Sequence, residues 1–293
     1  MEISIKVMRS VLIGLSCVAG TLVIVGFLGQ LHRVPDTISI GRPIFGLFCV
    51  AGMFAARSFW LKMAFACVVA AALFTTVRLL LPQQPGDDLK VYAKNLWFAN
   101  TEIPALVDDI EATGADAVML QEVSDRNIEV LRLLEKSYPY QHFCRFSSWS
   151  GIALASRHPI QGEPICSNSR AIAAVPVVIE NSKVWLVSVH IPWPWPHDSL
   201  NNEVDAERAL ADLDGALVIA GDFNSMPWSG RVGRIASLTN TRLTGPVRPT
   251  LKLRHVPLPL DFVLAPGGGS QEIRPFFGSD HAGVLANIRL RVP

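Results

Sequence analysis

Charged residues are distributed unevenly, and this divides the chain into an apolar first part and a mixed second part. Residues 10–31 carry no charge, and about 20 such residues are enough for a helix to span a bilayer. Two further uncharged runs, 43–56 and 63–77, are shorter, but basic residues at their ends can extend both toward the membrane surface. We therefore expect a transmembrane region over residues 1–82, with three helices.

Two other interpretations of the apolar runs exist. The first run could be a cleaved signal peptide, but it is long, lacks a small-x-small cleavage site and is followed by more apolar sequence. The two shorter runs could form one re-entrant hairpin or a buried pair, which would change the number of spans. The composition favours membrane segments, because 50% of the 293 residues are hydrophobic, only 17% are charged, and the mean hydropathy is +0.33.

Residues 83–88 are polar and rich in helix breakers, which predicts a linker. Beyond it, short apolar runs alternate with amphipathic ones. Strands are expected at 89–96, 116–120, 140–146, 151–156, 171–180, 184–190, 216–220, 260–265 and 284–290, and helices at 102–113, 125–136 and 202–213. Mixed strands and helices over 89–293 predict one layered α/β domain.

The net charge also differs between the two parts. Residues 1–86 hold seven basic and two acidic residues, which leaves 19 of the 26 basic and 23 of the 25 acidic residues for the rest. A mildly acidic domain argues weakly against tight, non-specific binding of DNA, which depends on neutralising phosphates.

Polar side chains stand where several expected strands end. Asn95 ends the first strand, Glu122 follows the second, and His190 ends a later one. Asp222 and Asn224 follow the strand at 216–220. Each alone is more often a turn, cap or solvated strand end, but α/β folds place their sites at strand ends, where such side chains converge.

Other residues complete this set. Gly221 allows a sharp turn beside Asp222, and Asp280 with His281 stands just before the last strand. Carboxylate and amide oxygens suit a hard cation such as Mg²⁺. Cleavage of a phosphoester needs such a cation, an activated water and a proton donor, and histidine can donate the proton or contact the phosphate.

The order of these motifs resembles that of the endonuclease/exonuclease/phosphatase superfamily, which includes pancreatic-type DNases, abasic-site endonucleases, inositol-phosphate phosphatases and neutral sphingomyelinases. The motifs are Gln121-Glu122, Ser188-Val189-His190, Gly221-Asp222-Phe223-Asn224, Leu260-Asp261-Phe262 and Ser279-Asp280-His281, with Ser156-Arg157-His158-Pro159-Ile160 as a further similar segment. The resemblance covers residue 89 to the C-terminus. It implies a four-layer fold, in which a sandwich of two β-sheets is flanked by helices.

The resemblance also implies metal ligands. Glu122 would bind Mg²⁺, or alternatively Mn²⁺, directly. Asn95 would help directly or through water, and Asp280 would support the site. Some members have an acidic residue where this chain has Trp97, which places a second metal site in doubt.

The same resemblance implies catalytic roles. Asp222 would orient or deprotonate the attacking water, and Asn224 would hold that water or the phosphate. His281, oriented by Asp261, would contact the scissile phosphate, and His190 would assist with the phosphate or the leaving group. The tyrosine that abasic-site endonucleases use has no identifiable counterpart, which leans away from DNA repair.

Together these features predict a membrane-anchored, metal-dependent phosphoesterase that hydrolyses a phosphodiester or phosphomonoester. A lipid, a small molecule and a nucleic acid all remain open as substrates, and the bilayer is the one further partner that we expect. The alternative is a membrane-held binding protein on an inactive phosphoesterase scaffold. The sequence predicts no protein partner and no oligomeric state.

Two segments bear on the substrate without deciding it. The loop after His190 holds Trp193 and Trp195 between prolines, and it could stack on a base, enter a lipid interface or pack on its own domain. A second stretch carries basic residues without an acid, and it could bind phosphates or be an ordinary solvated face. Its members are Arg231, Arg234, Arg242, Arg248, Lys252 and Arg254.

Flanking charges predict the orientation in a bacterial inner membrane. Lys6 and Arg9 favour a cytoplasmic N-terminus. Three spans then place the catalytic domain outside the cytoplasm, although basic residues in the first loop count against this. Cys144 and Cys166 are the only cysteines after residue 82. In an oxidising compartment we expect them to be bridged, and two separate thiols are the alternative.

Overall fold

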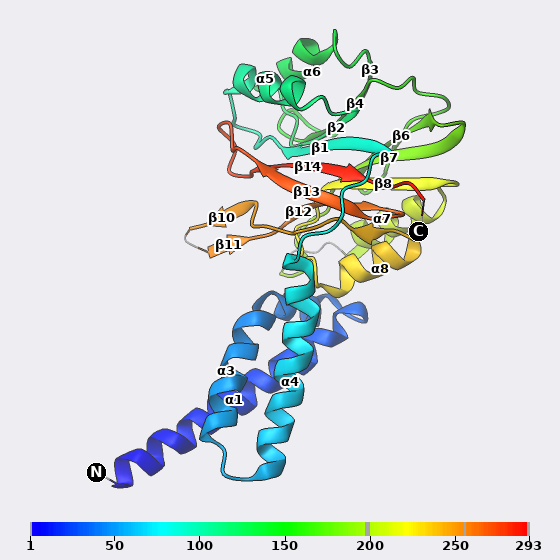
Figure 1. The fold of residues 1–293 in the computed structure, drawn as a ribbon. Helices are drawn as coiled ribbons and strands as arrows, with labels where there is room; N and C mark the ends of the chain where they lie inside the picture. Colours follow the sequence, from blue (N-terminus) through cyan, green and yellow to red (C-terminus); the bar gives the residue numbers. More distant parts are fainter. Residues whose placement is uncertain (1, 197–199, 255, 292–293) are drawn as a thin grey trace. The chain divides into compact units, whose positions relative to one another are not determined.

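The computed structural model describes residues 2–196, 200–254 and 256–291 (Figure 1). The chain divides into two compact units. Met1–Leu80 and Trp228–Arg234 make the first, and Leu81–Pro227 with Ile235–Pro293 makes the second.

The first unit consists of helices. They are α1 (Glu2–Phe27), α2 (Arg33–Ile38), α3 (Arg42–Ala55) and α4 (Phe59–Val77), with the short 3₁₀ segments η1 (Leu28–Gln30), η2 (Ser39–Gly41) and η3 (Arg78–Leu80). Three stretches are long and apolar enough to cross a membrane, namely Ile5–Gln30, Arg33–Ala55 and Phe59–Leu80. The second is longer than its uncharged run because α2 and η2 precede α3.

Small residues let α1 and α3 approach closely. Ser16 Oγ donates a hydrogen bond to Phe48 O over 2.8 Å, and a Cβ on Gly52 would lie 2.4 Å from Ser16 Cβ. Such contacts are typical of helices packed in lipid. Large apolar side chains meanwhile face outward, with Trp60 79% and Phe54 78% exposed. A surface this apolar is suited to lipid rather than water.

The second unit contains two six-stranded mixed sheets (Figure 1). The first has the order β13-β14-β1-β2-β4-β3 and the second β5-β6-β7-β8-β12-β9. The strands of the first sheet are β1 (Leu89–Asn95), β2 (Ala117–Gln121), β3 (Tyr140–Arg145), β4 (Gly151–Ser156), β13 (Gly269–Arg274) and β14 (Gly283–Ile288). Those of the second are β5 (Ile165–Cys166), β6 (Ile172–Ile179), β7 (Ser182–His190), β8 (Ala216–Asp222), β9 (Arg242–Leu243) and β12 (Asp261–Ala265). A separate hairpin pairs β10 (Leu251–Leu253) with β11 (Val256–Leu258).

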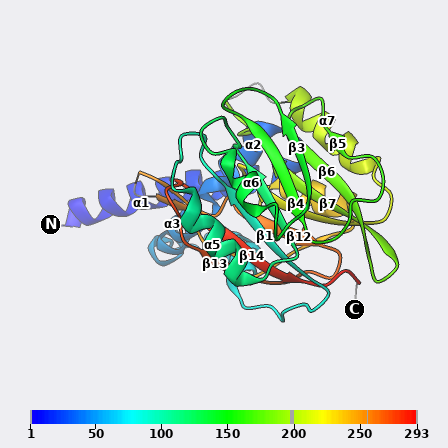
Figure 2. The same cartoon turned by 90° about the horizontal axis from the view of Figure 1, so that it is seen from above.

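Apolar residues fill the space between the sheets and the outer face of the first sheet. The inner cluster joins residues such as Val91 and Met119 to Val175 and Val218. On the outer face, α5 (Ile103–Thr113) and α6 (Glu129–Leu134) cover the sheet (Figure 2). Helices α7 (Leu200–Ala211) and α8 (Gly230–Leu238) follow later in the chain. The predicted sandwich of two sheets flanked by helices is confirmed.

Local chemistry explains where elements begin and end. Helix α5 stops at Gly114, which has φ 65° as a left-handed cap should. The helix expected at 125–136 is shorter, because Asn127 Oδ1 accepts a hydrogen bond from Ser124 N and holds the preceding segment in a turn. The β6–β7 hairpin turns at Glu180 and Asn181, both with positive φ, one residue earlier than the sequence suggested.

Candidate active site

Strand register brings the predicted polar residues to one end of the sandwich. In the first sheet, β1 and β2 are parallel, so Asn95 pairs with Gln121, the residue before Glu122. In the second sheet, β7 and β8 are parallel, and His190 pairs with Asp222. Asp261 lies opposite Asp222 on the antiparallel strand β12. Both sheets therefore present functional side chains at the same edge.

Gly221 is needed for this convergence. Its φ is +138°, and a Cβ there would lie 2.3 Å from Val189 O and 2.7 Å from Gln121 Nε2. Gln121 Nε2 in turn donates to Ser188 Oγ over 2.8 Å, which ties the first sheet to the second. The glycine thus permits a close approach of the sheets directly beside Asp222, whereas the sequence suggested a sharp turn at this position, which lies inside β8.

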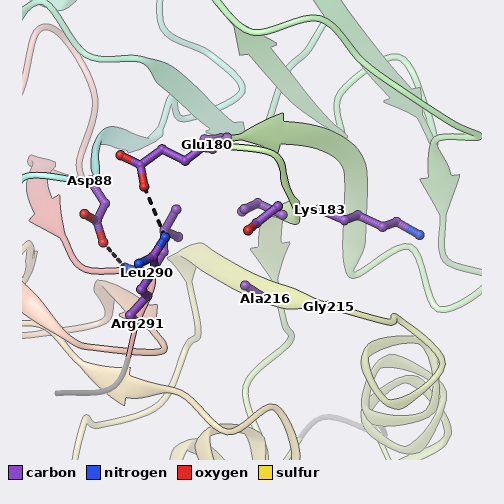
Figure 3. A pocket seen from close by; sticks show the side chains of 10 residues that line it. Asp88, Glu180, Lys183, Gly215, Ala216, Leu290 and Arg291 are labelled. Atoms are coloured by element: carbon purple, nitrogen blue, oxygen red, sulfur yellow. Dashed lines mark hydrogen bonds and ion pairs between the residues drawn. The ribbon is translucent and has the colours of Figure 1, made fainter.

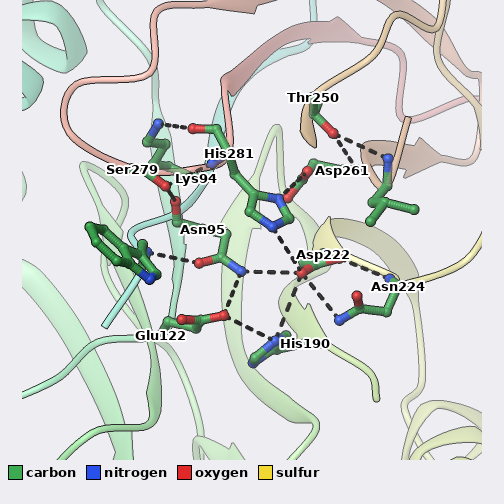
Figure 4. A network of polar contacts seen from close by, with 12 residues as sticks. Lys94, Asn95, Glu122, His190, Asp222, Asn224, Thr250, Asp261, Ser279 and His281 are labelled. Atoms are coloured by element: carbon green, nitrogen blue, oxygen red, sulfur yellow. Dashed lines mark hydrogen bonds and ion pairs between the residues drawn. The ribbon is translucent and has the colours of Figure 1, made fainter. Parts of the chain in front are cut away.

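The carboxylates of Glu122 and Asp222 face each other across the two sheets (Figure 4). One amide group lies between them, because Asn95 Nδ2 is 3.0 Å from Glu122 Oε1 and 3.1 Å from Asp222 Oδ2. The other Glu122 oxygen accepts a hydrogen bond from Phe98 N over 3.1 Å. Two acidic groups from separate sheets therefore share a single positively polarised donor.

Asp222 is almost fully buried and closely held. Asn224 donates its backbone N–H to Asp222 Oδ1 over 2.8 Å and its side-chain amide to Oδ2 over 3.2 Å. Burial, followed by repulsion from Asp261, raises the pKa of Asp222 to about 6, against the opposite effect of His281 and His190. A carboxyl group of this kind is suited to accept a proton near neutral pH.

His281 has the opposite character. Its Nδ1 lies 2.7 Å from Asp261 Oδ2, and its Nε2 lies 3.8 Å from Asp222 Oδ2. Burial alone would lower the pKa of His281, but the Asp261 and Asp222 carboxylates outweigh it and raise the pKa to about 10. The ring is therefore an imidazolium at neutral pH, and it can donate to an anionic oxygen through Nε2.

His190 and Asp280 stand at the margin of this group. His190 Nε2 lies 3.7 Å from Glu122 Oε1 and 3.8 Å from Asp222 Oδ2, and its side chain is 22% exposed. Asp280 is exposed. The structure thus brings Asn95, Glu122, His190, Asp222, Asn224, Asp261 and His281 together, and it leaves Asp280 at the rim.

The donor chemistry fits a hard cation. Asp222, Asp261 and His281 form one group of metal-binding residue types, with ligand atoms within 4.8 Å of one another. Within it, however, His281 Nδ1 is bonded to Asp261, and the neighbouring carboxylates raise the pKa of the ring, which favours a hydrogen-bond donor over a metal ligand. Glu122 and Asn95 offer the better place, because a hard cation prefers carboxylate and amide oxygens and the Asp222 carboxylate lies close by to add negative charge.

Three residues that sequence reasoning did not assign support the site (Figure 4). Lys94 is fully buried, and its Nζ donates to Phe276 O over 2.6 Å and to His281 O over 2.5 Å. Ser279 Oγ donates to Asn95 O over 2.8 Å and accepts from His281 N. Thr250 Oγ1 accepts from the backbone N–H of Asp261 over 3.1 Å.

Two of these three left a signal in the sequence, since Ser279 belongs to the Ser279-Asp280-His281 motif although no role was assigned to it. Lys94 is a charged residue inside an otherwise apolar strand, directly before Asn95. Burial lowers its pKa to about 8, against the effect of nearby carboxylates that include Asp261 and Asp280. Nothing distinguished Thr250, since its role depends on the strand β12 that passes beside it.

An aromatic group lies on one side of the site. The rings of Trp97 and Phe98 are 6.2 Å apart, and those of Phe98 and Trp149 are 6.5 Å apart, both edge to face. These side chains are 38%, 43% and 63% exposed. Trp97 occupies the position where some relatives have an acid, and its N–H donates to Asn95 Oδ1. Trp195, in the proline-rich loop, is 48% exposed.

The basic residues between Arg231 and Arg254 do not form one solvated face. Arg231 is completely buried. Arg234 Nη1 donates to the carbonyls of Gly29 and Gln30 within the helical unit. Lys252 lies over the ring of Phe276.

A separate pocket of about 290 Å³ lies at the other ends of β7 and β8 (Figure 3). Its lining includes Lys183 and Gly215, where these strands begin, whereas His190 and Asp222 stand where they finish. None of the predicted catalytic or metal-binding residues lines it.

The two-sheet sandwich, with carboxylates and histidines gathered at one end, is the fold of a metal-dependent phosphoesterase. Residues 94–281 match the Endonuclease/Exonuclease/phosphatase family. The chain belongs to this family. A search of curated proteins finds no match to the sequence.

Solved structures agree with this fold. An endonuclease/exonuclease/phosphatase family protein from Leptotrichia buccalis C-1013-b is 16% identical, with a TM-score of 0.55 over 69% of this chain and 99% of that one. A mutant of beta toxin from Staphylococcus aureus with bound magnesium ions is 14% identical, with a TM-score of 0.55 over 69% and 100%. The 3′ phosphatase NExo from Neisseria, bound to a product DNA hairpin, is 15% identical, with a TM-score of 0.54 over 69% and 99%.

Proposed function

We propose that this protein is a membrane-anchored hydrolase that cleaves a phosphodiester with the help of a divalent metal ion. One observation carries the proposal. Asp222, a buried carboxyl group with a raised pKa, lies beside the His281 imidazolium and shares the Asn95 amide with Glu122. A base, an acid and a cation-binding pair thus stand within reach of one phosphate.

Mg²⁺ is the proposed metal, with Mn²⁺ as the alternative. Glu122 and Asn95 would hold it, and Asp280 at the rim would add negative charge. The bound cation would supply positive charge to the phosphate oxygens. The magnesium ions in the beta toxin mutant show that a protein of this fold can bind this metal.

The side chains of this chain supply the remaining steps. Asp222 would accept the proton of the attacking water, while Asn224 keeps the Asp222 carboxylate in place through two hydrogen bonds. His281 would donate from Nε2 to a phosphate oxygen and so stabilise the charge that builds up in the transition state. His190, partly exposed, would assist the leaving group.

Features of the surface favour a lipid or a small phosphodiester as the substrate. The part of the chain after residue 86 is mildly acidic, and three exposed aromatic rings lie beside the site. Apolar rings suit an acyl or aryl group better than a polyanion. A nucleic acid remains the alternative, since NExo was solved with DNA. An inactive binding protein is less well supported, because seven of the eight expected groups converge.

We further propose that the three helices span a bacterial inner membrane and place the catalytic domain outside the cytoplasm. Lys6 and Arg9 before the first span support this orientation. C-terminal fusions test it. Alkaline phosphatase should be active in this position and a cytoplasmic reporter inactive, and the opposite pattern would reverse the orientation.

Hydrolysis of a bis-aryl phosphodiester tests the activity. We expect the full-length protein in detergent to release the phenol with Mg²⁺, to stop when EDTA is added, and to recover with fresh Mg²⁺. Asp222→Asn serves as the catalytic control, and Asp214→Asn, which changes an exposed acid paired with Lys183, as the matched surface control. Turnover that persists in Asp222→Asn, or that never appears with either metal, would overturn the proposed function.

A further inference from the structure

A disulfide joins the two sheets at one side of the sandwich. Cys144 and Cys166 are bonded, with their Cα atoms 5.6 Å apart, as the sequence predicted. Cys144 is on β3, the last strand of the first sheet, and Cys166 is on β5, the first strand of the second. The bond therefore links the two neighbouring edges of the sandwich.

A histidine lies against this disulfide. His142 is two residues before Cys144 on β3, so both side chains are on the same face of the strand. His142 Nε2 is 3.3 Å from Cys144 Sγ and also 3.3 Å from Cys166 Sγ. The ligand atoms of all three residues lie within 4.8 Å of one another.

We propose that reduction of this disulfide converts His142, Cys144 and Cys166 into a binding site for a thiophilic divalent cation such as Zn²⁺. A dithiol would transfer two electrons and two protons to the disulfide and would itself become a disulfide. The two thiols formed would then lose their protons as their sulfurs bind the cation. The sheet edges would remain linked, by a metal in place of a covalent bond.

Two of the three distances between ligand atoms already suit a tetrahedral metal site. Bond lengths of about 2.3 Å to sulfur and about 2.0 Å to nitrogen place the two ligand atoms about 3.5 Å apart around a tetrahedral Zn²⁺. Both nitrogen–sulfur distances are 3.3 Å here. Only the two sulfurs have to separate, to about 3.8 Å by the same geometry. Cys166 is exposed on a two-residue edge strand, so it is the side chain with room to move.

The proposed site and the catalytic site differ in the softness of their ligand atoms, so they should bind different metal ions. Thiolate and imidazole ligands select Zn²⁺ and similar ions, whereas the oxygen ligands of Glu122 and Asn95 suit Mg²⁺. Three protein ligands leave a fourth position for water. The exposure of Cys166 gives a cation access from solvent.

Cobalt is the probe of choice, because only a thiolate ligand produces a sulfur-to-cobalt charge-transfer band. The full-length protein in detergent is reduced with a dithiol, freed of it under argon, and titrated with Co²⁺. We expect a charge-transfer band that saturates at one Co²⁺ per chain and disappears when Zn²⁺ is added. The oxidised protein should show no band, and circular dichroism should show that the reduced protein is folded.

Variants identify the ligands. Cys144→Ser with Cys166→Ser should abolish the band, which controls for Cys17, Cys49 and Cys67. His142→Ala should weaken Co²⁺ binding at least tenfold, whereas His158→Ala, a histidine elsewhere in the same unit, should leave it unchanged. The proposal is wrong if the reduced, folded protein gives no band, if His142→Ala binds Co²⁺ as well as the wild type, or if reduction occurs only with loss of the folded spectrum.

Discussion

His281 Nδ1 and Asp261 Oδ2 lie 2.7 Å apart, and both side chains are almost completely buried. The imidazolium uses one nitrogen for this bond, so its other nitrogen is directed toward the side on which Asp222 lies, 3.8 Å away. Asp261 therefore fixes both the charge and the direction of the histidine. The buried Asp261–His281 pair thus holds the proposed acid beside the proposed base, Asp222.

Removing the proposed base, Asp222, should lower the rate of hydrolysis. Asp222→Asn keeps the size of the side chain, and we expect kcat to fall by about 10²- to 10⁴-fold, which is the usual range for a proton acceptor. Steady-state hydrolysis of the bis-aryl phosphodiester measures this. A loss below tenfold would contradict the assignment of Asp222 as the base.

The same variant should show a distinct stability profile in the metal-free protein. The pKa of Asp222 is raised to about 6 in the folded state. A raised pKa means that its stabilising contribution is present below the unfolded value of about 3.9 and is lost as the pH rises through about 6. The stability of Asp222→Asn relative to wild type should therefore increase between pH 4 and pH 8. Thermal unfolding in EDTA measures the difference, and a flat profile would argue against the raised pKa.

Asp261 and His281 should behave as one unit. His281→Ala should lower kcat by about 10²- to 10⁴-fold, and Asp261→Asn somewhat less, because it misdirects the ring without removing it. The double variant should be little worse than His281→Ala alone, since the contact is already broken. Losses that multiply in the double variant would show that the two residues act independently.

Glu122→Gln should affect the metal more than the chemistry. The amide keeps the shape of the side chain but removes the negative charge that attracts a cation. We expect the Mg²⁺ concentration for half-maximal activity to rise at least tenfold, with kcat largely recovered at saturating Mg²⁺. Glu129→Gln, an exposed acid on α6 paired with Arg132, is the matched control. An unchanged Mg²⁺ requirement would remove Glu122 from the metal site.

Lys94 should act through the loop that carries Asp280 and His281. Lys94→Met removes the bonds to the carbonyls of Phe276 and His281, so the loop keeps only the bond from Ser279 to Asn95 O as a tie to the end of β1 among those described above. We expect kcat to fall more than tenfold while KM changes less than threefold, because the acid is misplaced rather than the substrate site blocked. Lys94→Arg should recover part of kcat. Equal kcat in the Met variant and the wild type would limit Lys94 to a purely structural role.

The sequence alone predicted most of the elements and nearly all of the polar groups at the site. Asn95, Glu122, His190 and Asp222 could be found because each ends or follows a buried strand, where a polar residue stands out against apolar neighbours. The transmembrane candidates were visible for the same reason, as long uncharged runs. Thr250 left no signal, because a hydroxyl group in a turn is not distinctive until its partner is known, and the motif that contains Ser279 did not show which groups its hydroxyl would bind.

Hydrophobic periodicity and the order of motifs therefore determined the family, the sandwich and the types of group that this protein could use. Tertiary structure decided how those groups act. The pKa of Asp222 rises because the folded chain buries it and strand register places Asp261 opposite it, and the pKa of His281 rises because the Asp261 and Asp222 carboxylates outweigh its burial. His142 meets two sulfurs only because the edges of two sheets come together. Charge interaction and metal geometry depend on distances of a few ångströms between residues far apart in the chain, and a linear pattern does not contain those distances.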